Sequence, residues 1–122
     1  MIETRVIPVS ASALGNEAHI AVHLRGQGPL CVLLHGYPLD HRMWLDVLHS
    51  PLAERRTLCA IDLRGHGQSP WAGDTTHTME LLASDVAAVI RTLSEDGQAD
   101  VCGLSMDGYV ALALMARSEE HT

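Results

Sequence analysis

Two segments near the start of the chain alternate apolar and polar residues. Residues 4–9 and 19–24 both follow this pattern, which is typical of β-strands with two different faces. Gly15 and Asn16 lie between them, and both residue types are common in turns. The pattern therefore predicts two neighbouring strands joined through a turn near residue 15.

Three later segments are apolar without alternation. Residues 30–34, 57–63 and 99–104 are short and contain several branched residues. Runs of this length and composition favour strands that are buried on both faces, as in parallel sheets. The segment 26–29, Gly-Gln-Gly-Pro, predicts a turn before the first of them. We expect the strand at 99–104 to pair on one side with the strand at 30–34.

The segments between these strands have helical periodicity. Residues 40–55 predict a helix that Pro51 bends or ends. A second helix begins near Thr78, whose hydroxyl can cap it, and a third covers residues 106–117. The apolar residues of the second helix fall on one face: Leu82, Val86, Val89, Ile90 and Leu93.

This alternation of buried strands and helices predicts an α/β fold. We expect a mixed, mostly parallel sheet with an antiparallel N-terminal strand pair and helices on both faces. Residues 1–122 would form one partial domain, since the chain is long enough for one small core. Ligands of such sheets bind at the carboxyl ends of the parallel strands, which here are followed by residues 35–36, 64–65 and 104–105.

Composition narrows the classes of partner and location. A formal charge of −7 argues against nucleic acid and anionic membranes. No apolar segment follows Met1 in the manner of a secretory signal, and no apolar run is long enough to span a bilayer. Cys31, Cys59 and Cys102 each lie in or beside an apolar segment, so we expect buried, reduced thiols in a cytoplasmic protein.

The segment 103–108, between a predicted strand and a predicted helix, carries the clearest chemistry. It reads GLSMDG, and its beginning matches the strand-turn-helix motif that presents a nucleophilic serine. The sharp turn pushes the hydroxyl of Ser105 out over the sheet, and Gly103 lets the two arms approach. The backbone N–H of Met106, at the helix N-terminus, points to where an oxyanion would form.

A second oxyanion donor is expected in the loop after the strand at 30–34. His35 and Gly36 begin this loop, and Gly36 lets the backbone turn closely. The N–H of Tyr37 is the predicted donor, because Pro38 has no N–H.

Three motifs together resemble the α/β-hydrolase family. Residues 35–44 (HGYPLDHRMW), 62–69 (DLRGHGQS) and 103–106 (GLSM) occur in the family's order and spacing. Within the family they are similar to small esterases, enol-lactonases and cofactor-free haloperoxidase-like enzymes. The resemblance covers nearly all of the chain.

The resemblance implies hydrolysis of a carboxylic ester or lactone without a cofactor. It implies that Ser105 attacks an acyl carbon, that Tyr37 and Met106 form the oxyanion hole, and that His35 and the turn at 64–67 support the site. It further implies a triad acid and a histidine later in the chain than Ser105. We therefore expect residues 1–122 to be one part of a longer protein, which ends after the helix following Ser105, lacks the triad acid and histidine, and is inactive by itself.

One departure from the family pattern leaves an alternative open. Asp107 stands where the family has glycine, two residues after the serine. Its side chain would crowd the turn and its charge would oppose an oxyanion, although a carboxylate near a helix N-terminus is favourable. The alternative function is therefore a non-catalytic binding protein with the same fold.

Two other ligand classes are disfavoured. His19 and His23 have a spacing that suits a metal on a helix, but four residues along a strand span roughly 13 Å, so no metal site is predicted. Residues 65–70 begin like a dinucleotide-binding motif but end in Pro70 with no helix to follow.

Overall fold

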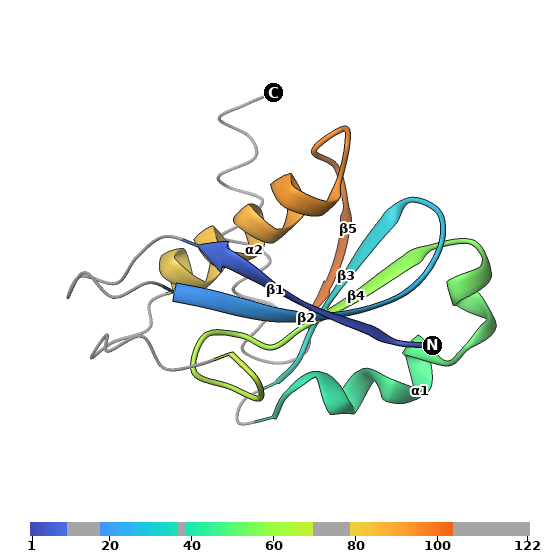
Figure 1. Cartoon of the computed structure of the whole chain (residues 1–122), viewed down its shortest axis with the longest axis horizontal. Helices are drawn as coiled ribbons and strands as arrows, with labels where there is room; N and C mark the ends of the chain where they lie inside the picture. The colour runs from blue at the N-terminus through green and yellow to red at the C-terminus, as the bar shows by residue number, and fades with distance from the viewer. Residues whose placement is uncertain (10–17, 37–38, 70–78, 104–122) are drawn as a thin grey trace.

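A computed structural model describes residues 1–9, 18–36, 39–69 and 79–103 of the chain (Figure 1). The predicted turn near residue 15, the Thr78 cap and the helix at 106–117 lie outside these residues. Among the described residues, no helix has both the length and the apolar character needed to cross a membrane.

The described strands form one mixed sheet. Its order is β1-β2-β4-β3-β5. The strands are β1 (Glu3–Val9), β2 (Ala18–Gly26), β3 (Leu30–Leu34), β4 (Thr57–Ile61) and β5 (Asp100–Gly103). β2 pairs antiparallel with β1 and with β4, whereas β3 pairs parallel with both β4 and β5. The predicted mixed sheet, its antiparallel N-terminal pair and the pairing of the last strand with residues 30–34 are confirmed.

The predicted helix at 40–55 is in fact three short pieces. They are η1 (His41–Trp44), α1 (Leu45–Leu48) and η2 (Pro51–Glu54). The Asp40 side chain caps the first by accepting from the Arg42 N–H, and the Ser50 side chain caps the third, where Pro51 occupies the first turn. The Ser50 cap and Pro51 restart the helical hydrogen bonding, so the segment cannot form one continuous helix, and the predicted break at Pro51 is confirmed.

The core has two parts, one on each face of the sheet. Val32 and Leu34 face the long helix α2 (Met79–Leu93), together with Val86 of that helix. On the opposite face, Leu33 packs with Leu48 of the short helices. Figure 1 shows α2 on one side of the sheet and α1 on the other. This two-sided burial is the physical reason for the unbroken apolar runs, and it confirms helices on both faces.

β5 departs from the sequence prediction. We predicted a strand buried on both faces, but its residues alternate between exposed and half-buried. Val101 packs against the α2-side core, while Asp100 on the other face forms an ion pair with Arg56, 2.7 Å long. Burial of all three thiols is also wrong, because Cys59 is buried, Cys31 is half-buried and Cys102 is exposed; all three are free.

Candidate active site

Three parallel strands bring the chemically interesting segments to one edge of the sheet. The register pairs Leu34 of β3 with Ile61 of β4 and with Gly103 of β5, so the three strands end side by side. The residues that follow β3 and β4 are therefore neighbours at this edge, and β5 ends beside them. Ser105 lies two positions beyond Gly103 in the sequence. Ser105, Met106, Asp107 and Tyr37 themselves lie outside the described residues, so their roles remain predictions.

His35, the first residue after β3, is held by the backbone at both ring nitrogens. It is 1% exposed. Its Nε2 accepts a hydrogen bond from the Leu63 N–H (3.0 Å), which leaves Nδ1–H to donate to the Gly36 carbonyl (3.1 Å). Burial is the main cause that lowers the pKa of His35. The neutral ring is hydrogen-bonded at both nitrogens and links the ends of β3 and β4. It is therefore not free to act as a general base.

The backbone of Gly36, at the start of the predicted oxyanion loop, makes two hydrogen bonds. Its carbonyl accepts from the Leu39 N–H at 2.7 Å, and its N–H donates to the Met43 sulfur at 3.3 Å. Met43 thus holds the loop from the side of η1. Trp44 packs against the core on the same face of the sheet as η1, and its buried Nε1 has no hydrogen-bond partner among the described residues.

Asp62, directly after β4, lies at the centre of a buried polar cluster. Its side chain is 0% exposed and accepts four N–H groups. Oδ1 accepts from the His41 N–H (2.7 Å) and His41 Nδ1 (2.9 Å), and Oδ2 accepts from His23 Nε2 (2.9 Å) and the Gln68 N–H (3.1 Å). Burial raises the pKa of Asp62, but these hydrogen bonds outweigh it and hold the pKa below its usual range.

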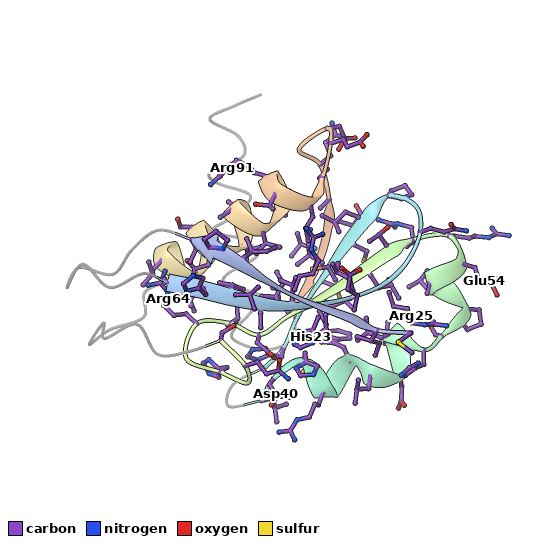
Figure 2. All side chains as sticks on the ribbon, in the orientation of Figure 1. His23, Arg25, Asp40, Glu54, Arg64 and Arg91 are labelled. Atoms are coloured by element: carbon purple, nitrogen blue, oxygen red, sulfur yellow. The ribbon has the colours of Figure 1, made fainter. Side chains whose placement is uncertain are left out.

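The turn after Asp62 is fixed by two further contacts. Arg64 forms a bidentate ion pair with Asp85 of α2, at 3.0 and 2.8 Å, and both side chains are 1% exposed. Gly67 has a φ of +50°, and a Cβ there would lie 2.5 Å from the Asp62 carboxyl carbon. Only glycine therefore lets the turn pass so close to Asp62. Figure 2 shows Arg64 near the start of α2, while His23 and Asp40 lie on the opposite side of the sheet.

His23, His41 and Asp62 also have the composition of a metal site. Their potential ligand atoms lie within 4.8 Å of one another. However, the two imidazole rings stack face to face, with centroids 3.4 Å apart and planes 18° from parallel. In-plane lone pairs of stacked rings run side by side and do not converge on one ion, and the carboxylate already accepts N–H donors at hydrogen-bond distance. The geometry favours a hydrogen-bonded cluster.

Sequence reasoning missed this cluster and the Arg64–Asp85 pair. Asp62 was noticed only as part of a motif, and His23 only as a rejected metal ligand. The signal that could have found the cluster is His23 itself. It lies between Val22 and Leu24 in a strand, and the neighbouring strand β4 is apolar.

Comparisons with known proteins agree with the fold. A family model described as the alpha/beta hydrolase fold matches residues 29–121. A pimeloyl-[acyl-carrier protein] methyl ester esterase of Aeromonas hydrophila is 36% identical over 95 residues, which cover 78% of this chain and 35% of that protein.

Two solved structures are also similar. A thermophilic esterase from Thermogutta terrifontis superposes with a TM-score of 0.81 at 32% identity, covering 93% of this chain and 41% of its own. The N-acyl homoserine lactonase AidH gives a TM-score of 0.84 at 26% identity, covering 98% and 42%. The chain thus spans roughly two fifths of the length of these proteins. By the family model and the shared fold, the chain belongs to the alpha/beta hydrolase fold family.

Proposed function

We propose that the protein hydrolyses a carboxylic ester or lactone through an acyl intermediate on Ser105. The observation that carries this proposal is the position of Gly103 at the end of β5, in register with Leu34 of β3. β5, which ends two residues before Ser105 in the sequence, therefore ends beside β3, which His35 and Gly36 follow. A nucleophile and an oxyanion loop at adjacent strand ends are what acyl transfer requires.

The reaction has two balanced steps. The Ser105 oxygen attacks the acyl carbon, a base takes the hydroxyl proton, and the alkoxide leaves as an alcohol after it receives that proton. Water then attacks the acyl-serine ester, releasing the carboxylic acid and restoring the hydroxyl. The N–H groups of Tyr37 and Met106 stabilise the negative oxygen formed in each step. His35 is unsuited to be the base, because both its nitrogens are engaged. The family resemblance assigns that role to a histidine later in the chain than Ser105.

The relatives support the substrate class. The similar proteins from Aeromonas hydrophila and Thermogutta terrifontis are esterases, and AidH is a lactonase. A lactone is a cyclic ester, so the same steps open its ring without releasing a separate alcohol. The substrate is proposed to be a small molecule, and a cytoplasmic location stays a prediction from the sequence.

Asp107 favours a second candidate, a non-catalytic binding protein. A carboxylate next to the oxyanion site would repel the charge that develops during the reaction. The two candidates differ in one measurable property, namely the reactivity of Ser105.

The test is covalent labelling of the protein in its full length. A fluorophosphonate should form an adduct that peptide mass spectrometry places on Ser105, and the protein should hydrolyse p-nitrophenyl acetate or a simple lactone. Ser105→Ala should abolish both the adduct and the turnover. Labelling that persists in Ser105→Ala, or no labelling of the intact protein, would rule out the nucleophile.

A further inference from the structure

The segment on either side of Tyr37 is attached to the two residues that follow β4. Before it, the His35 ring accepts from the Leu63 N–H at 3.0 Å. After it, the His41 N–H donates to Asp62 Oδ1 at 2.7 Å, and the His41 ring donates to the same carboxylate. The chain is therefore fixed to Leu63 at His35 and to Asp62 at His41, on the two sides of Tyr37.

The second of these attachments uses a donor that helix formation leaves free. His41 is the first residue of η1, and the first N–H groups of a helix have no partner within the helix. Asp62 accepts this N–H from a fully buried position, and its pKa is held low enough to keep it ionised at neutral pH. A charged acceptor makes the bond shorter and stronger than a neutral one. The entry of the chain into η1 is thereby fixed relative to β4.

His23 extends the attachment to β2. Its Nε2 donates to Asp62 Oδ2 at 2.9 Å, and its Nδ1 lies 3.0 Å from the Thr4 hydroxyl of β1. The His23 and His41 rings, which both donate to Asp62, also stack on each other. Asp62 is thus immobilised by groups from β2, from η1 and from the turn that contains Gln68.

We propose that Asp62, with His23 and His41, positions the oxyanion loop for catalysis. The inference rests on the proposed function, because it assigns these residues a role in the same reaction. They are positioning residues: they contact the loop's far end and not the substrate. An oxyanion donor acts mainly in the transition state, so a displaced loop should lower kcat much more than it raises KM.

The structure offers a matched pair of substitutions at one position. His41→Ala removes the ring but keeps the backbone N–H that Asp62 accepts. His41→Pro removes both, yet proline suits the first position of a helix, and the preceding Asp40 is already extended, with φ −152° and ψ −168°. The difference between the two variants isolates the N–H bond. Val89→Ala, a truncation in the core beside α2, is the control for lost stability alone.

The three variants are compared in the full-length protein, at a temperature where each is folded by circular dichroism. Ester turnover and the rate of fluorophosphonate labelling are both measured. We expect His41→Ala to lower kcat by a few fold and His41→Pro by roughly ten- to a hundredfold, which is within the effect of losing one oxyanion donor. KM should change by less than about threefold. Val89→Ala should lower the melting temperature and leave kcat unchanged.

Each outcome bears on one idea. If intact protein is not labelled at Ser105, the proposed function is wrong. If it is labelled but His41→Pro keeps the kcat of Val89→Ala, the positioning role is wrong. Should His41→Pro not fold, His41→Ala decides, and a kcat equal to that of the unsubstituted protein refutes the inference.

Discussion

Acidification should destabilise the protein through His35. The ring is 1% exposed, and its Nε2 accepts from the Leu63 N–H. A proton on Nε2 would face that N–H and break the bond. Burial lowers the pKa of His35 below its usual value, so the unfolded chain binds this proton more tightly than the folded protein. The contribution of the neutral His35 ring to stability is therefore complete above a pH of about 6.5 and is lost as the pH falls below it.

The size of this loss in the free energy of unfolding follows from the linkage between proton binding and folding. If the folded ring stays neutral at pH 5.5, an unfolded pKa of about 6.5 makes the loss between pH 7.5 and 5.5 about 1.4 kcal/mol. This is an upper limit for one histidine, and partial protonation of the folded state reduces it. The protein has eight histidines, so the contribution of His35 must be isolated by substitution.

His35→Gln provides that isolation. The glutamine amide oxygen can accept from the Leu63 N–H but does not titrate. Urea unfolding at pH 7.5 and 5.5 should show a pH-dependent loss that is smaller in His35→Gln by up to about 1.4 kcal/mol. His49→Gln, at an exposed histidine, is the control and should retain the full loss. If His35→Gln and the unsubstituted protein lose the same stability on acidification, the assignment of a neutral, accepting ring is wrong.

Three further predictions concern other parts of the molecule. Arg64→Met should reduce the free energy of unfolding by about 3–5 kcal/mol, since it leaves Asp85 buried without its bidentate partner; a loss below about 1 kcal/mol in urea would contradict this. Cys102 should react with a disulfide reagent in the native protein, whereas Cys59 should not, because burial raises its pKa to about 12; equal rates would show that β4 opens readily. Asp107→Gly should raise kcat by up to roughly a hundredfold, since about 3 kcal/mol of repulsion is expected at about 6 Å; an unchanged kcat would mean that the carboxylate points away.

The strands could be predicted from this sequence because the pattern of apolar residues in a strand reflects which of its faces are buried. The unbroken run at 30–34 is apolar since α2 covers one face of β3 and the short helices cover the other. The same rule overestimated the burial of β5, because an apolar run does not reveal which strand lies at the border of the described sheet. The prediction of a helix at 40–55 was wrong in part for a local reason. Its apolar residues are periodic, but residues 41–44 form a 3-10 helix in place of an α-helix, and the cap at Ser50 with Pro51 begins a separate piece.

The cluster at Asp62 depends on register, which no local pattern contains. β2 and β4 pair antiparallel with His23 opposite Ala60, and the Asp62 N–H continues the pairing by donating to the Ala21 carbonyl. His23 and Asp62 are therefore diagonal neighbours on one face, although 39 residues separate them. Shifting the register by one residue would turn His23 to the opposite face of the sheet and leave the Asp62 charge buried with fewer donors. The polar cluster thus favours the observed strand register, in addition to the positioning role that we propose for it.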